Sequence, residues 1–161
     1  MKFAYADPPY PGMAHLYPEN TEVDHRKLIG DLTLGFPDGW ALSTSSVALR
    51  DVLNLCPEDV RIAAWVKPFA SFKPNVNPAY AWEPVIFRGG RKRTREDLTV
   101  RDWHSSPITL QKGLVGAKPE SFCYWVADLL GAQDDDELID IFPGTGVMDR
   151  TRQQARLVNV P

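Results

Sequence analysis

Short apolar runs alternate with helical patterns along almost the whole 161-residue chain. Runs of strand length, bounded by proline, glycine or charged residues, predict β-strands, and they lie at 2–6, 40–43, 60–66, 83–87 and 137–142. Apolar residues at helical spacing predict helices at about 24–34, 45–55, 119–131 and 147–155, before a last strand at 156–160. This alternation predicts one α/β domain over residues 1–161, with a Rossmann-like, doubly wound and mostly parallel sheet.

The helix patterns carry local expectations of their own. Leu34 and Val47 fall on the apolar stripes of the first two helices, so we expect them to be buried. Ser45 or Ser46 is expected to cap the second helix, and Pro119 suits the first turn of the third.

Several classes of protein are excluded by composition. The longest apolar runs are strand-length and are broken by charges, so neither a membrane span nor a secretory signal is expected and a cytoplasmic location in a bacterial or phage-infected cell is predicted. Cys56 and Cys123 lack the C-x-x-C spacing of a zinc site, so both are expected to be small core residues, and no metal is predicted.

Positive charge is concentrated in one segment of an otherwise acidic chain. The net charge is −3, yet Arg88, Arg91, Lys92, Arg93, Arg95 and Arg101 stand against only Glu96 and Asp97. A charge run of this kind is typical of a solvated loop, and the alternative is a phosphate-binding loop. Because residues 91–115 show little apolar periodicity, we expect a loop over about 88–115.

Two unusual loops follow predicted strands. Asp7-Pro8-Pro9-Tyr10 follows the first strand, and Phe142-Pro143-Gly144-Thr145-Gly146 follows the strand at 137–142. Open α/β sheets bind ligands at the carboxyl ends of their strands, so both loops are candidates for a binding site. No Lys-Ser or Lys-Thr follows Gly146, which excludes a Walker-type phosphate loop.

The first loop suits a flat ring that carries an amine. Tyr10 can stack on the face of such a ring, while Asp7 and the Pro8 carbonyl accept hydrogen bonds from an exocyclic amine. Each loop also has a simpler interpretation, as a rigid turn or as a tight connection from strand to helix.

These motifs together resemble those of S-adenosylmethionine-dependent methyltransferases that act on the amine of adenine. Asp-Pro-Pro-Tyr, then Lys118-Pro119, then Phe-x-Gly-x-Gly is similar to the circularly permuted motif order of the β group of DNA methyltransferases. The segments around Trp65 and Trp82 are also similar to MT-A70-like proteins and their phage relatives. The resemblance covers nearly the whole chain.

The resemblance implies a role for each motif. Asp7, Pro8, Pro9 and Tyr10 would form the catalytic loop, with Asp7 also near the cofactor. The implied contacts to S-adenosylmethionine are Asp7, Lys118, Pro119, Phe142, Pro143, Gly144, Thr145 and Gly146. The implied reaction is methyl transfer to N6 of adenine in DNA.

The resemblance also implies target recognition by the basic loop at about 88–115, which lies between the catalytic strands and the Lys-Pro helix in sequence. The basic residues Arg88, Arg91, Lys92, Arg93 and Arg95 are the candidate phosphate contacts, and Trp65, Lys67 and Glu83 are further candidates for substrate contact. Lys67 and Glu83 could instead pair with each other. Trp103 and His104 could either stack beside a base or form a satellite apolar contact.

The C-terminus departs from the pattern of the family. Complete members continue to a strand whose terminal acid binds the cofactor ribose, whereas this chain has Asn159 there and ends at Pro161. This difference predicts a domain truncated at its C-terminus, and a homodimer in which a second subunit completes the site is one alternative. RNA or a free nucleobase as substrate, and a catalytically weakened binding subunit, also stay open.

Overall fold

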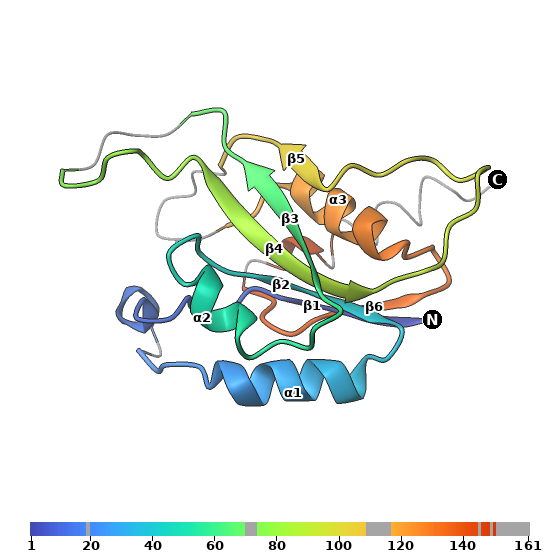
Figure 1. The fold of residues 1–161 in the computed structure, drawn as a ribbon, viewed down its shortest axis with the longest axis horizontal. Helices are drawn as coiled ribbons and strands as arrows, with labels where there is room; N and C mark the ends of the chain where they lie inside the picture. The colour runs from blue at the N-terminus through green and yellow to red at the C-terminus, as the bar shows by residue number, and fades with distance from the viewer. Residues whose placement is uncertain (19, 70–73, 109–116, 145, 149, 151–161) are drawn as a thin grey trace.

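The computed structural model describes residues 1–18, 20–69, 74–108, 117–144, 146–148 and 150. Three-layered α/β architecture is visible in Figure 1, with one sheet between helices. The elements are, in chain order, β1 (Lys2–Ala6), the 3-10 turn η1 (Ala14–Leu16), α1 (His25–Gly35), β2 (Gly39–Ser43), α2 (Leu49–Leu53), β3 (Arg61–Val66), β4 (Trp82–Gly89), β5 (Trp103–Ser105), α3 (Glu120–Leu130) and β6 (Glu137–Asp140).

The described strands form a six-stranded sheet in the order β5-β3-β4-β2-β1-β6. β1 pairs in parallel with both β2 and β6, and β3 pairs in parallel with β5. β4 is antiparallel to its neighbours β2 and β3. The predicted mostly parallel sheet is therefore confirmed, with β4 as the reversed strand.

Alternating side chains of β1 show how the sequence builds both faces of the sheet. Phe3 and Tyr5 point into the apolar layer beneath α3, whereas Ala4 and Ala6 belong to the layer that α1 and α2 cover. This period of two is the pleat of a strand that is buried on both faces.

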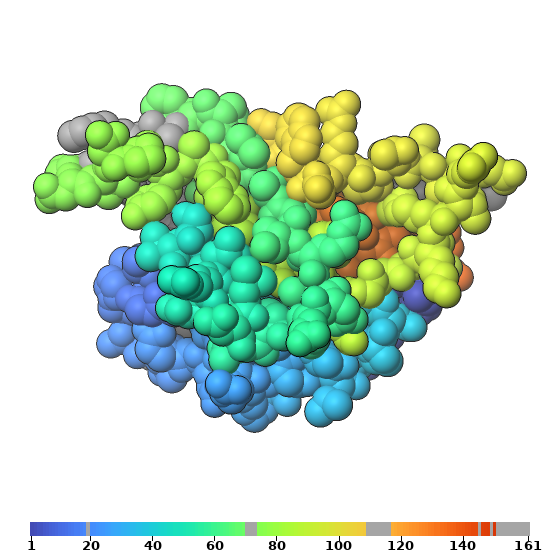
Figure 2. Space-filling view, viewed as in Figure 1, coloured from blue at the N-terminus to red at the C-terminus, as the bar shows by residue number. Residues whose placement is uncertain are grey.

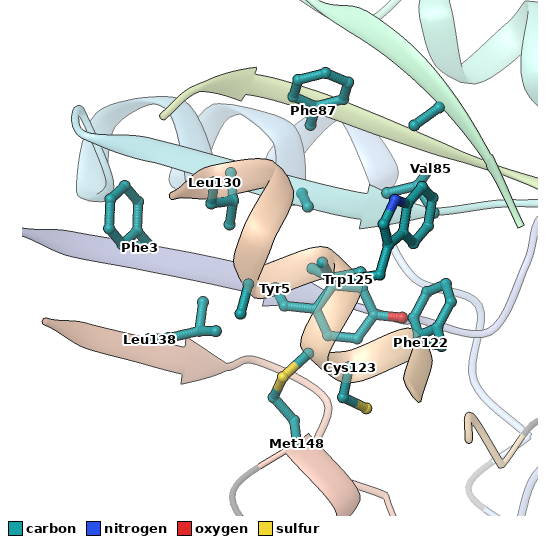
Figure 3. Close-up of a cluster of buried hydrophobic side chains, with 14 of the residues drawn as sticks. Phe3, Tyr5, Val85, Phe87, Phe122, Cys123, Trp125, Leu130, Leu138 and Met148 are labelled. Carbon is teal, nitrogen blue, oxygen red and sulfur yellow. The ribbon is translucent and has the colours of Figure 1, made fainter. Parts of the chain in front are cut away.

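The layer between the sheet and α3 is rich in aromatic residues, as Figure 3 shows. Phe122 of α3 is fully buried, and its ring lies 5.2 Å from that of Trp65 and 5.9 Å from that of Tyr5. Met148 and Leu138 close the layer on the β6 side. Burial of such rings anchors the start of α3 against the carboxyl ends of β1 and β3.

Local capping signals bound the longer helices as expected. Asp24 accepts a hydrogen bond from the Lys27 N–H at 3.0 Å at the start of α1. Pro119 is the N-cap of α3, one residue before its predicted place in the first turn, and Gly131 ends that helix with a left-handed φ of 64°. The predicted cap of the second helix by Ser45 or Ser46 is wrong: α2 begins at Leu49 with Ala48 as an N-cap that makes no side-chain hydrogen bond, and Ser45 accepts from the Ala48 N–H at 3.1 Å in the preceding turn.

Some local expectations are wrong. Leu34 is exposed because the buried stripe of α1 is narrower than the apolar pattern, and Val47 is exposed because α2 begins only at Leu49, which leaves Val47 in the preceding turn. The short strand β5 was not predicted, since its three residues have no apolar alternation. Most of the predicted helix at 147–155, and all of the strand at 156–160, lie outside the described residues.

Within the described part of the chain, no helix is both long and apolar enough to cross a membrane. Cys123 is buried and Cys56 is partly buried, and both are free thiols, as expected of small core residues. Burial raises the pKa of the Cys56 thiol to about 11 and that of Cys123 to about 12.

Candidate active site

The two loops singled out in the sequence leave the same edge of the sheet from neighbouring strands. β1 and β6 are parallel, with Tyr5 opposite Asp140, and the Ile141 N–H donates to the Tyr5 carbonyl at 2.9 Å. Residues 7–10 and 142–146 therefore begin side by side, about 5 Å apart across the ladder. Parallel pairing thus brings together two motifs that are more than 130 residues apart in sequence.

Five polar side chains, two of them from the first loop itself, lie in contact with one another. Lys118 Nζ lies 2.8 Å from Asp7 Oδ2 and 3.6 Å from Glu83 Oε2. The Tyr10 hydroxyl donates to Glu83 Oε2 at 2.8 Å, and Lys67 forms an ion pair with the other oxygen of Glu83. We call Asp7, Tyr10, Lys67, Glu83 and Lys118 the buried charge cluster.

Charges within the cluster balance, with two ammonium groups facing two carboxylates. Burial raises the pKa of Asp7 above its usual value, and the Lys118 ammonium offsets only part of that effect. Burial acts in the same direction on Glu83, but Lys118 and Lys67 outweigh it and leave its pKa lowered. Burial alone would lower the pKa of Lys118, yet Asp7 and Glu83 raise it, so this lysine stays charged.

The difference between the two carboxyl groups matters for chemistry. Asp7 is the more readily protonated of the two, and it lies directly after the end of β1. Glu83 is held ionised between two lysines and fixes the Tyr10 hydroxyl. One carboxylate is thus suited to exchange a proton with a ligand, and the other to position a ring.

Trp65 lies beneath the cluster and does not face solvent. Its ring is within 5.6 Å of Lys118 Nζ and 5.2 Å of Lys67 Nζ. Its indole N–H donates to the Ser106 hydroxyl at 2.8 Å and lies 3.1 Å from the Ser106 carbonyl. The predicted contact of Trp65 with substrate is replaced by a supporting contact with the two ammonium groups.

The glycine loop has the backbone shape that its sequence predicts. Gly144 and Gly146 have φ angles of 45° and 67°, in the left-handed region that favours glycine. The Gly146 N–H donates to the Pro143 carbonyl, which closes a tight turn directly after Phe142. A Cβ atom at Gly144 would meet only the Phe142 carbonyl, at 3.7 Å, so the backbone here is open to a ligand. Thr145 lies outside the described residues.

Two arginines of the basic segment have acidic partners within the chain. Arg88 pairs with Asp59 at 2.7 Å. Arg91 pairs with the buried carboxylate of Asp136 at 2.7 Å and donates to the Gly131 carbonyl. Arg91 therefore ties the segment to the end of α3, a structural role that its position in a charge run did not indicate.

Other residues of the basic segment are more exposed. Arg93 donates to the backbone carbonyls of Leu98 and Asp128. Lys92 and Arg95 lie on the surface of the segment. The predicted phosphate contacts are thus divided between arginines with internal partners and two outward-facing cations.

His104 and Trp103 take different positions on β5. The His104 ring stacks on Trp125 at 5.7 Å, and its Nε2 lies 3.2 Å from the Ser121 hydroxyl. Burial lowers the pKa of His104, in keeping with this packed position. His104 therefore forms the satellite contact that was one of its two interpretations, whereas Trp103 remains exposed.

The most informative contact missed in the sequence is that between Lys118 and Asp7. Lys118 was singled out only for its place in a Lys-Pro motif, and nothing in the pattern indicated its partner. The contact arises because Pro119 starts α3 at the edge where β1 ends.

Sheet order and layers define a Rossmann-like α/β fold. Two crystal structures share it, those of the M1.HpyAVI–SAM complex and of M1.HpyAVI. The first aligns with 95% of this chain and 77% of its own, at 12% identity and a TM-score of 0.65. The second aligns with 95% and 76%, at 14% identity and a TM-score of 0.61. No family model and no curated protein sequence matches the chain.

Proposed function

We propose that this protein transfers a methyl group from S-adenosylmethionine to the N6 amine of adenine in DNA. The observation that carries the proposal is the convergence of the Asp7 to Tyr10 loop, its buried charge cluster and the glycine loop at the ends of two neighbouring parallel strands. This is the place where α/β sheets of this kind bind their ligands.

The glycine loop fits the cofactor. The backbone at Gly144 and Gly146 is left-handed, and around Gly144 no side chain stands within 4 Å of the place where a Cβ would lie. The structural neighbour that carries SAM in its name supports the same choice. Bound there, S-adenosylmethionine supplies a methyl group activated by its sulfonium. Pro143, Thr145 and Pro119 are proposed as further contacts of this pocket.

Residues of the first loop would hold the adenine. Tyr10 stacks on the ring, with its hydroxyl fixed by Glu83 so that the face stays in place. Asp7 and the Pro8 carbonyl accept the two N6 hydrogens, and Pro9 keeps that carbonyl aimed outward. Orientation matters here because the N6 lone pair is delocalised into the ring and is a weak nucleophile.

Asp7 is proposed both to stabilise the positive charge that forms on the amine and to accept the proton that the amine then loses. As the N–C bond forms, the bond between the methyl group and the sulfonium would break with its electron pair left on sulfur, so the positive charge would pass to the amine, where the carboxylate of Asp7 stabilises it. The amine then loses one proton, and the raised pKa of Asp7 suits it to accept that proton. Lys118 keeps Asp7 ionised before the reaction, so we propose that it acts mainly through Asp7 and less through the cofactor.

DNA contact is proposed for the basic segment, which leaves the sheet at the end opposite the first loop, because Gly89 pairs with Gly39 and Gly39 with Phe3 near the start of β1. Lys92 and Arg95 are the best placed to meet phosphates, because Arg88, Arg91 and Arg93 already have partners within the chain. Lys67 and Glu83 would contact the substrate only indirectly, through Tyr10.

A transfer assay tests the proposal. The protein is incubated with radiolabelled S-adenosylmethionine and adenine-containing DNA, and the product is digested to identify N6-methyladenine. Asp7→Ala is expected to lower the rate at least about 100-fold, while the exposed control Asp51→Ala keeps it. Absence of transfer by the wild-type protein to any DNA would overturn the proposal, and a methyl group on another atom would overturn the N6 assignment.

A further inference from the structure

A cavity of about 930 Å³ lies beside β5, the edge strand of the described sheet. Its walls come from residues 93–101, from β5 and from α3, and they include Arg93, Glu96, Asp97, Arg101, Trp103 and Asp128. In Figure 2 the yellow atoms of the segment before β5 border the orange atoms of α3. The volume is in the range of ligand sites in proteins. We call this space the β5 cavity.

The β5 cavity extends to the edge of the sheet that carries the candidate active site. Ser105, in its wall, lies opposite Val66 at the end of β3, where Lys67 follows. β3 runs in the same direction as β1 and β2, since β4 is antiparallel to both β2 and β3. Two strand spacings, about 10 Å, separate β5 from β4, whose Glu83 holds Tyr10. A nucleic-acid strand in the candidate site can therefore reach the cavity.

The basic segment forms one wall of the cavity. It leaves the sheet after Gly89, at the end opposite the first loop, and returns along β5 to the edge where that loop lies (Figure 1). Lys92 and Arg95, the two outward-facing cations, flank Arg93 of the cavity wall in sequence. Phosphate contacts on this segment would thus keep a DNA strand beside the cavity.

Trp103 offers an exposed aromatic ring at the cavity. Its exposed fraction is 46%, and the Arg101 guanidinium lies over the ring, 5.3 Å from the centroid. In the described part of the chain no acceptor pairs with this guanidinium, whereas Arg93 donates to two backbone carbonyls. Aromatic rings and guanidinium planes are the groups on which proteins stack unpaired bases.

The charges that line the cavity favour a base over a phosphate as its occupant. Arg93 and Arg101 are accompanied by three acids, Glu96, Asp97 and Asp128, which would repel a phosphate. Base edges carry both hydrogen-bond donors and acceptors, so they match a lining of guanidinium and carboxylate groups. Asp97 already accepts from the Thr94 N–H at 2.6 Å, which leaves the other two carboxylates as acceptors for a ligand.

We propose that the β5 cavity binds one unstacked base of the substrate strand, close to the target adenine, with Trp103 against its face and Arg101 at its edge. The inference rests on the proposed function and adds a second base contact to it. A base that enters the Tyr10 loop leaves its stack, which frees the face of a neighbouring base. Trp103 would cover such a face, while the cations of the basic segment hold the backbone beside it.

Fluorescence anisotropy at one salt concentration tests the proposal with two labelled single strands of about 12 nucleotides and no cofactor. One strand carries all its bases, and in the other every position except a central adenine is abasic. The ratio of the two Kd values measures what the flanking bases contribute. Trp103→Ala is expected to reduce this ratio roughly 5- to 150-fold, the worth of stacking on one base. Trp103→Phe, which keeps a ring, should retain most of it.

Two further variants separate base contact from charge and from tryptophan exposure. Arg101→Lys keeps the charge but loses the planar group, so the ratio should fall while the dependence of Kd on salt stays the same. Trp82→Ala is the matched control, because Trp82 is 39% exposed and lies on β4 outside the cavity. Its ratio should equal that of the wild type. Unchanged urea midpoints would show that each variant is folded.

Three results would overturn this inference. One is a ratio for Trp103→Ala equal to that of the wild type. A second is a fall in Trp82→Ala as large as that in Trp103→Ala. A third is binding of free deoxynucleoside monophosphates as tight as that of the strand, which would make the cavity a site for a free nucleotide. If the ratio falls as expected but the wild type transfers no methyl group, the cavity remains a base site and the proposed function fails.

Discussion

Lys118 and Asp7 form a buried ion pair between residues 111 apart, with Nζ 2.8 Å from Oδ2. The pair joins the start of α3 to the end of β1. Lys118 also reaches Glu83 and the Tyr10 hydroxyl, so one ammonium group holds the acid and the aromatic ring of the candidate site together. The geometry of the first loop therefore depends on the packing of a helix distant in sequence.

Lys118→Met is expected to destabilise the protein by about 3–5 kcal/mol, because it leaves two buried carboxylates facing only Lys67. Urea denaturation measures this change. The double variant Asp7→Asn/Lys118→Met should lose less unfolding free energy than the sum of the losses in the two single variants, because neutralising Asp7 removes the charge that Lys118→Met leaves unpaired. Strict additivity would show that the pair is not coupled.

Tyr10→Phe separates the ring from its hydroxyl. The variant keeps the stacking face but loses the hydrogen bond to Glu83, so kcat/KM for methyl transfer is expected to fall about 5- to 15-fold. Tyr10→Ala removes the face as well and should cost about 100-fold or more. Tyr124→Phe, at an exposed position on α3, serves as the control. Equal rates for wild type and Tyr10→Ala would contradict the stacking role.

Gly144→Ala tests the cofactor loop. A left-handed φ costs alanine about 1–2 kcal/mol, so the Kd for S-adenosylmethionine should rise roughly 5- to 30-fold in calorimetric titration. Gly30→Ala on α1, where a Cβ atom meets nothing within 4 Å, should leave the affinity unchanged. Equal affinity for Gly144→Ala would argue against cofactor binding at this turn.

Stability should fall as acid protonates Asp136. Burial by itself would raise its pKa, but hydrogen bonds from the Met1 ammonium, the Gln133 N–H and Arg91 hold the pKa well below its usual range. Since the folded-state pKa lies below the unfolded value of about 3.9, this contribution is complete above that value and is lost as pH falls through the folded-state pKa.

Asp136→Asn should therefore lower the free energy of unfolding by about 3 kcal/mol at pH 7. The difference from the wild type should shrink near pH 3, in denaturant titrations at the two pH values. Asp135→Asn, an exposed neighbour, should change stability by less than about 0.5 kcal/mol at both. If the difference in unfolding free energy between the wild type and Asp136→Asn grew as pH fell, the lowered pKa of Asp136 would be contradicted.

Lys92 and Arg91 should behave differently although they are adjacent. Lys92→Ala is expected to weaken DNA binding and reduce the slope of log Kd against log salt by about 1, with stability unchanged. Arg91→Ala should mainly destabilise the protein, because it removes a partner from buried Asp136. Salt titrations and urea melts on both variants distinguish the roles. If Lys92→Ala lowered stability while Arg91→Ala changed only DNA affinity, the assigned roles of the two residues would be contradicted.

Local patterns were sufficient for most of the elements. Apolar runs ending at Pro8 and at Pro143 located β1 and β6, and Asp24 and Gly131 bounded two helices. Such signals act between residues that are near in sequence, through backbone geometry and capping. They also placed both loops at strand ends, because strand direction and helical crossovers follow from the alternation itself.

Reversal of β4 could not be predicted in this way. Parallel neighbours need a long crossover, whereas β3 and β4 pair directly through Val66 and Trp82, and no local pattern states which partner a strand will choose. The partner of a charged residue is equally hard to predict from local sequence, as Arg91 shows. Its place in a basic run indicated a phosphate contact, but the fold supplies the buried carboxylate of Asp136.

Local sequence patterns were enough to locate most strands and helices and the two loops, and to show which residue types stand at the strand ends. Only the tertiary structure decided that Lys118 meets Asp7, that Glu83 holds Tyr10 and that Trp65 lies beneath both lysines. Local order depends on dihedral preferences and short-range hydrogen bonds. Pairing across the sheet depends instead on packing α3 against the ends of β1, β3 and β4, where burial makes each charge require a partner.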